Sequence, residues 1–150
     1  MGYKKSNYSV YSSMVKIDNV SKPINITNLI KRNKIEQQKD KLLKIPKGFN
    51  NNVYWNIAHT VITQQILIYK FSGLQMRVPD NLVDKFMKGT VPDGTASDEE
   101  MMMIADFLIS TAEWLIEDYN TELFKTFKEY TTSARVTLKN VDDAIAFNLF

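Results

Sequence analysis

The stretch NNNVYWNIAHTVITQQILIYKFSG, residues 50–73, sets the architecture, because it holds the longest clean helical pattern in the chain. Apolar and aromatic residues recur along it at steps of three and four, which is the spacing of one face of an α-helix. The single histidine of the chain, His59, lies on that face between Trp55 and Ile62. The pattern therefore predicts a long amphipathic helix whose histidine side chain points inward.

Both ends of this helix carry sequence signals. The asparagines at residues 50–52 can cap the free backbone amides, and Ser72-Gly73 can adopt the left-handed conformation that ends a helix. An inward histidine has two interpretations: a core residue hydrogen-bonded to a neighbour, or a ligand for a metal. The first is the commoner, and the residues alone leave both open.

Composition narrows the class of protein. A chain of 150 residues with 44% hydrophobic content can bury one core, which predicts a single domain. The absence of cysteine excludes disulfides and thiolate chemistry from these residues. No apolar run approaches the roughly 20 residues of a membrane span, and no signal-peptide pattern follows the N-terminal lysines. We therefore expect a soluble, cytoplasmic protein without a membrane partner.

Charge is distributed unevenly along the chain. Residues 1–49 contain eleven Lys/Arg and three Asp/Glu, a balance of +8, whereas residues 50–150 contain eight and fourteen, a balance of −6. The basic part could bind nucleic acid, or it could lie on the acidic remainder of its own fold. Its lysines are dispersed and no arginine-aromatic platform accompanies them, which favours the second interpretation. Residues 1–23 show no regular period, and we expect a mobile basic arm there.

The rest of the chain is also mainly helical in pattern. Further helices are expected over residues 26–45, 81–88, 97–119 and 140–150. Asp80, Ser97 and Asn140 are the predicted N-caps of the last three. Residues 120–139 predict a long irregular connection with short helical turns.

This order of elements predicts an all-α domain over residues 24–150, built as an antiparallel four-helix bundle. Phe86, Met87 and Leu108 are among the side chains expected inside it. The fourth helix would be truncated, because its apolar pattern runs to Phe150 without a C-cap. A short fourth helix would leave part of the central helix uncovered, as an open apolar groove.

Three blocks of the sequence resemble a known family: PKGFNNNVYWNIAHTVITQQILIYKFSGL, the later EYTTSARVTL and the closing NVDDAIAFNLF. Together they are similar to the DinB-like superfamily of metal-dependent proteins, whose relatives include bacillithiol- and mycothiol-dependent transferases. The similarity spans roughly residues 45–150. It implies an up-down-down-up bundle of DinB/YfiT type that holds a divalent metal, nickel or zinc, with three histidines.

His59, in the Trp55-x-x-x-His59 block, matches the first metal ligand of this family. Its neighbours on the helix are expected to line the metal pocket, namely Trp55, Asn56, Ile62 and Thr63. The other two ligands of the family come from a His-Glu-x-x-His stretch on the fourth helix, which these 150 residues do not contain. We therefore expect an incomplete metal site that does not retain its ion.

Two classes of function follow from these observations. The first is a DinB-like metal-dependent transferase or hydrolase that acts on a small molecule or thiol, through a metal-activated nucleophile. The alternative is a non-catalytic helical module for binding or oligomerisation, in which a homodimer buries the apolar groove. Nucleic-acid binding by the basic arm is a third and weaker interpretation.

Overall fold

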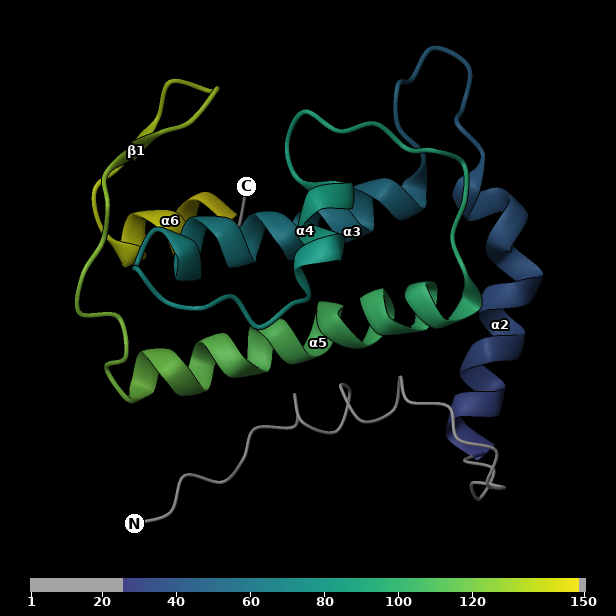
Figure 1. Ribbon diagram of the computed structural model, residues 1–150, viewed down its shortest axis with the longest axis horizontal. Coiled ribbons are helices and arrows are strands. Elements are labelled where there is room, and N and C mark those ends of the chain that lie inside the picture. Colours follow the sequence, from purple (N-terminus) through teal and green to yellow (C-terminus); the bar gives the residue numbers. More distant parts are fainter. Residues whose placement is uncertain (1–25, 149–150) are drawn as a thin grey trace.

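The computed structural model describes residues 26–148, with side-chain surroundings from residue 32 onward. The predicted arm, residues 1–23, lies outside the described residues. The elements follow in the order α2 (Ile26–Leu43), α3 (Val53–Gln64), the π-helical η1 (Gln65–Lys70), α4 (Asp80–Phe86), α5 (Asp98–Asn120), β1 (Tyr130–Thr131), β2 (Thr137–Leu138) and α6 (Val141–Asn148) (Figure 1). The described chain is thus mostly helical, with one small hairpin added. None of the described helices is both long enough and apolar enough to cross a membrane.

The central helix begins at Asn52, as its N-cap signal predicts. The Asn52 side chain accepts a hydrogen bond from Trp55 N at 2.7 Å, and its amide group donates to Leu43 O at 3.0 Å. One buried side chain therefore caps α3 and ties its start to the end of α2. The helix continues as η1, and Gly73 follows with a φ of 72°, the left-handed conformation expected there.

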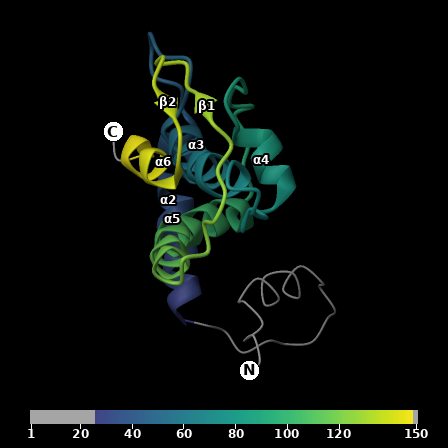
Figure 2. The same cartoon turned by 90° about the vertical axis from the view of Figure 1, so that its left-hand side faces the viewer.

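α3 and α5 run side by side in the same direction. Tyr54 near the start of α3 donates to Glu100 near the start of α5, and Tyr69 in η1 donates to Asp118 near the end of α5. α6 packs on η1 and α3 and runs back the other way, which matches the later part of an up-down-down-up order (Figure 1). α2 instead crosses α3 and α5 steeply, so a regular antiparallel four-helix bundle is not confirmed (Figures 1 and 2).

Because α3 and α5 are parallel, the chain has to return along their length between them, and residues 71–97 do so. α4 lies in this return and packs on α3. Asp80 does not cap α4 as predicted: Pro79 holds the N-cap position, and Asp80 is the first helical residue. Phe86 is buried as expected, whereas Met87 is 41% exposed, because the helix ends at Phe86 and extended backbone follows.

Two clusters of buried side chains hold these elements together. The larger cluster joins α3 to α4 and α5, through Tyr54, Trp55, Ala58, Val61, Ile62, Val78, Leu82, Val83, Phe86, Met101, Ile104 and Phe107. The smaller cluster joins η1 to β2 and α6, through Leu67, Ile68, Tyr69, Leu138 and Ala144. Burying one large apolar side chain contributes roughly 1.5–3 kcal/mol, so packing stabilises helices as short as α4 and α6. The prediction that Leu108 is buried is wrong, because the buried face of α5 passes through Ile104, Phe107 and Thr111.

Residues 120–139 contain a short antiparallel hairpin in place of the predicted helical turns. Threonine is frequent there, and Tyr130 and Val136 lie within the hairpin; these residue types favour extended backbone when one side is covered. Leu138 supplies that cover, since it is buried in the smaller cluster. The predicted caps of α5 and α6 are confirmed: Ser97 caps α5 and Asn140 caps α6, each by accepting a bond from the backbone amide three residues on.

Candidate functional site

His59 on α3 is held by contacts at both ring nitrogens. Its Nδ1 lies 2.7 Å from the backbone oxygen of Phe86, at the end of α4. A carbonyl oxygen can only accept a hydrogen bond, so Nδ1 carries the proton and donates it. In the neutral ring the lone pair then lies on Nε2, which is 3.3 Å from the Thr63 hydroxyl. This tautomer presents Nε2 as a ligand atom, in the way that metal-binding histidines are commonly oriented.

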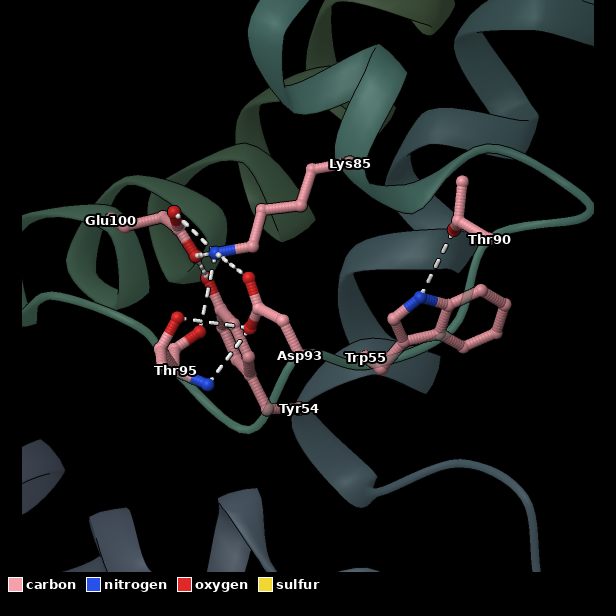
Figure 3. A network of polar contacts seen from close by, with 7 residues as sticks. All are labelled: Tyr54, Trp55, Lys85, Thr90, Asp93, Thr95 and Glu100. Carbon is pink, nitrogen blue, oxygen red and sulfur yellow. Dashed lines mark hydrogen bonds and ion pairs between the residues drawn. The ribbon is translucent and has the colours of Figure 1, made fainter.

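The plane of the His59 ring is set by Trp55. The two rings stack, with their centroids 4.5 Å apart and their planes 12° from parallel. The indole N–H of Trp55 donates in turn to the Thr90 hydroxyl at 3.2 Å (Figure 3). The orientation of His59 therefore depends on the loop after α4 as well as on its own helix.

A polar network holds that loop against α3 and α5 (Figure 3). The Lys85 ammonium lies 3.1 and 3.0 Å from the two carboxylate oxygens of Glu100, and it donates to Thr95 O at 3.2 Å. Asp93 Oδ2 lies 3.6 Å from the same ammonium, and the Tyr54 hydroxyl donates to Glu100 Oε1 at 2.8 Å. The donors of Lys85 all face oxygen atoms, so this network is closed.

The protonation states of the network suit a structural role. Burial, followed by the hydrogen bond to the Glu100 carboxylate, raises the pKa of the Tyr54 phenol well above its ordinary value. The backbone amide and hydroxyl of Thr95, with Lys85 nearby, hold the pKa of Asp93 below its ordinary value. At neutral pH Tyr54 is thus a neutral donor and Asp93 an anion.

The structure brings two of the four predicted pocket residues into contact with His59. Trp55 stacks on the ring and Thr63 faces its Nε2 atom. Ile62 is fully buried in the larger core cluster, and the Asn56 side chain is exposed to solvent. The half-buried His59 is therefore bounded on one side by the core and on the other by solvent.

Two groups that orient the site were not predicted from the sequence. The Phe86 oxygen selects the tautomer of His59, and Thr90 holds Trp55. A backbone oxygen 27 residues away from the histidine leaves no residue-type signal. The turn signals of the loop after α4, Pro92 and Gly94, were visible in the sequence, but nothing in that loop pointed toward Trp55.

Among the described residues, His59 is one well-oriented ligand for a metal. Within residues 26–148, no group of three or more His, Cys, Asp or Glu side chains is placed to hold an ion. The carboxylates of the neighbouring network, Glu100 and Asp93, are engaged by Lys85. His59 thus fits the role of a single imidazole ligand, but the described residues do not form a complete divalent-metal centre.

A second feature is an apolar groove beside α5, which we call the α5–α6 groove. One part of it, of about 240 Å³, reaches α3 and is lined mainly by Val61, Ile68, Leu108, Leu115, Ile116 and Ile145. The adjoining part, of about 420 Å³, lies between α5 and α6 and includes Tyr119 and Ala146. Ile116 is 63% exposed on its rim.

The fold and the site define a helical protein with a preoriented imidazole on its central helix. A model of the DinB superfamily matches residues 36–150, and the chain belongs to that superfamily. The match begins inside α2, earlier than the resemblance at residue 45 suggests. No curated protein and no solved structure matches the chain.

Proposed function

We propose that this DinB-superfamily protein is a metal-dependent transferase or hydrolase for a small molecule or thiol, with His59 as one metal ligand. The main support is the tautomer of His59, which leaves the lone pair on Nε2. The hydroxyl of Thr63, at 3.3 Å, is a long and therefore weak partner for that nitrogen. Little competes with an incoming metal for the ligand atom.

The chain contains one histidine, so a centre with three imidazoles draws the other two from outside these 150 residues. A nickel or zinc ion bound there would lower the pKa of a coordinated water or thiol and make it a nucleophile at neutral pH. The residues of this chain would keep the ligand in place. Phe86 O holds the proton on Nδ1, Trp55 holds the ring plane, and Thr90 holds Trp55.

Metal titration tests this proposal. Residues 1–150 should purify without metal and bind added Ni²⁺ only at millimolar concentrations, because one imidazole and waters hold an ion weakly. His59→Ala should remove this binding, and Asn56→Ala, an exposed change on the same helix, should leave it unaltered.

A version that includes residues encoded after Phe150, where the gene has them, should hold about one ion per chain and lose it on His59→Ala. Elemental analysis after dialysis measures the metal content. A firmly bound ion that survives His59→Ala, or a longer version that stays metal-free, would overturn the assignment.

A second candidate function, a non-catalytic binding or oligomerisation module, is favoured by the α5–α6 groove. We infer that a second copy of the chain covers it, because Leu108, Ile116 and Tyr119 are 46–63% exposed along one side of α5. Light scattering should find a dimer, which Ile116→Glu converts to a monomer. Glu113→Gln, on the exposed surface of the same helix, is the control. A wild-type monomer at high concentration that binds no hydrophobic dye would exclude this candidate.

A further inference from the structure

A cavity of about 300 Å³ lies at the far end of the α3–α5 pair from the loop network. Its walls come from η1, the segment after it and the second half of α5, through Tyr69, Leu74, Met76, Arg77, Trp114 and Leu123. Tyr69 is roughly 15 Å along the helix from His59, at about 1.5 Å per residue, so the cavity is separate from the candidate metal site. Its volume is at the lower end of the range of ~300–1,000 Å³ found for ligand pockets.

Arg77 is the charged group of this cavity, and it is held from several sides. Its Nη2 donates to Asp118 Oδ1, and its backbone N donates to the fully buried Gln65 side chain at 2.7 Å. Its guanidinium carbon lies 5.9 Å from the centre of the Tyr69 ring and 5.5 Å from the centre of the Trp114 ring. A guanidinium fixed in this way loses little conformational entropy when it binds a ligand.

Asp118 balances the charge of Arg77 from inside the protein. Its side chain is only 8% exposed, and its second oxygen accepts a bond from the Tyr69 hydroxyl at 2.6 Å. Burial, and then the hydrogen bond to Asp118, raise the pKa of Tyr69, so its phenol stays a neutral donor. Both oxygens of Asp118 are therefore engaged: Oδ1 holds the guanidinium at Nη2, and Oδ2 holds the Tyr69 hydroxyl.

The other donors of Arg77 are available to a ligand. A guanidinium carries five N–H groups in a planar fork, and among residues 32–148 the side chain's acceptor is Asp118, through Nη2. Lys85, in the loop network, differs in this respect, because its donors all face oxygens. The Arg77 side chain is 29% exposed, so the rest of its fork can be reached.

We propose that this cavity binds a small carboxylate that has a flat or branched apolar body. The carboxylate would accept bonds from the free edge of the Arg77 fork, since guanidinium and carboxylate groups match in planar geometry. Trp114, Leu74 and Leu123 would contact the apolar body. His59 and its metal take no part, so this inference is independent of the function proposed above.

Benzoate is the probe for this site, and benzyl alcohol is its uncharged counterpart. In an NMR titration of the ¹⁵N-labelled full chain, benzoate should shift the indole N–H signal of Trp114 with a millimolar Kd and leave that of Trp55 in place. Benzyl alcohol should bind about tenfold more weakly, because it lacks the charge-assisted bonds to Arg77.

Arg77→Gln should weaken benzoate binding about tenfold or more, because it removes the fork. Arg32→Gln is the matched control, since it breaks an exposed ion pair with Glu99 elsewhere on the surface. Leu123→Trp fills the cavity while keeping the Arg77 and Asp118 side chains, and should abolish binding even where Arg77→Gln folds poorly. Benzoate binding that survives Leu123→Trp, or no shift of Trp114 at tens of millimolar benzoate, would overturn the proposal.

Discussion

The two ends of the α3–α5 helix pair carry the same polar arrangement in different surroundings. At each end a tyrosine donates to a carboxylate that also binds a cation, as in Tyr54–Glu100–Lys85 and Tyr69–Asp118–Arg77. The loop after α4 covers the first arrangement and leaves a cavity of only about 10 Å³ there, whereas the second faces one of about 300 Å³. One arrangement therefore locks a loop, and the other lines a pocket.

The cation explains part of this difference. A lysine ammonium has three donors, which a carboxylate and a few loop oxygens can satisfy, whereas the five donors of an arginine extend beyond a single carboxylate. The closed end also affects the candidate metal site, because its loop holds Trp55, and Trp55 holds His59. The network around Lys85, whose donors are all bonded, thus positions Trp55. Arg77 at the other end has donors left over, and these can bind a ligand.

Removing the carboxylate at the pocket end should have the largest effect. Asp118→Ala leaves the Tyr69 hydroxyl and the Arg77 guanidinium without their acceptor in a mostly buried site, which should lower the free energy of unfolding by about 3 kcal/mol. Glu100→Ala should cost less, about 1–2 kcal/mol, because its lysine keeps two other oxygen partners. Urea unfolding measures both changes. Equal losses would show that the two ends are energetically alike.

Alkaline pH should weaken both ends together. The pKa values of Tyr54 and Tyr69 are raised in the folded state, by burial first and then by their carboxylate partners, while unfolded tyrosines titrate near pH ~10. The stabilisation is complete below about pH 10. Above it the unfolded chain releases phenol protons that the folded chain retains, so the free energy of unfolding falls by about 1.4 kcal/mol per pH unit for each tyrosine.

Urea unfolding across this pH range, on wild type and on the two Tyr→Phe variants, measures the effect. Tyr54→Phe and Tyr69→Phe should each remove about half of the tyrosine contribution to the slope. A slope that neither variant changes would mean that other groups cause the alkaline loss.

The cap of α3 should matter less than the buried carboxylate. Asn52→Ala removes both the bond to Trp55 N and the bond to Leu43 O. It should lower the free energy of unfolding by about 1–2 kcal/mol. Asn140→Ala, at the exposed cap of α6, should cost about 1 kcal/mol or less. Thermal unfolding monitored by circular dichroism compares the two. A larger loss for Asn140→Ala would contradict the role given to the buried cap.

The smallest effect is expected at Thr63. Thr63→Val removes the hydroxyl that faces His59 Nε2, so Ni²⁺ should bind about twofold more tightly, with about 0.5 kcal/mol or less of change in stability. Thr60→Val is the control, because the Thr60 hydroxyl bonds to Asn56 O instead of the ring. Titration of each variant with Ni²⁺ measures the affinities. Weaker binding by Thr63→Val would indicate that the hydroxyl supports the metal.

The local sequence pattern predicted the caps of the helices better than it predicted which of their side chains are buried. Asn52, Ser97 and Asn140 act as caps, as expected, because a cap depends on a side chain and a backbone amide two or three residues away. Leu108 was misplaced, since helical spacing alone does not say which side of a helix meets a neighbour, and Met87 was misplaced because α4 ends one residue before it.

Residue type and short-range spacing were enough to predict the helical class and an inward-facing imidazole at His59, and the resemblance of three sequence blocks indicated the superfamily. They did not establish which nitrogen of that imidazole is free, because the oxygen that accepts its proton belongs to the backbone of Phe86. Nor did they join Arg77 to Asp118, which is 41 residues further on, or place the pair beside a cavity. Such contacts arise from how helices distant in the chain pack against each other, and a pattern that spans a few residues carries no information about that packing.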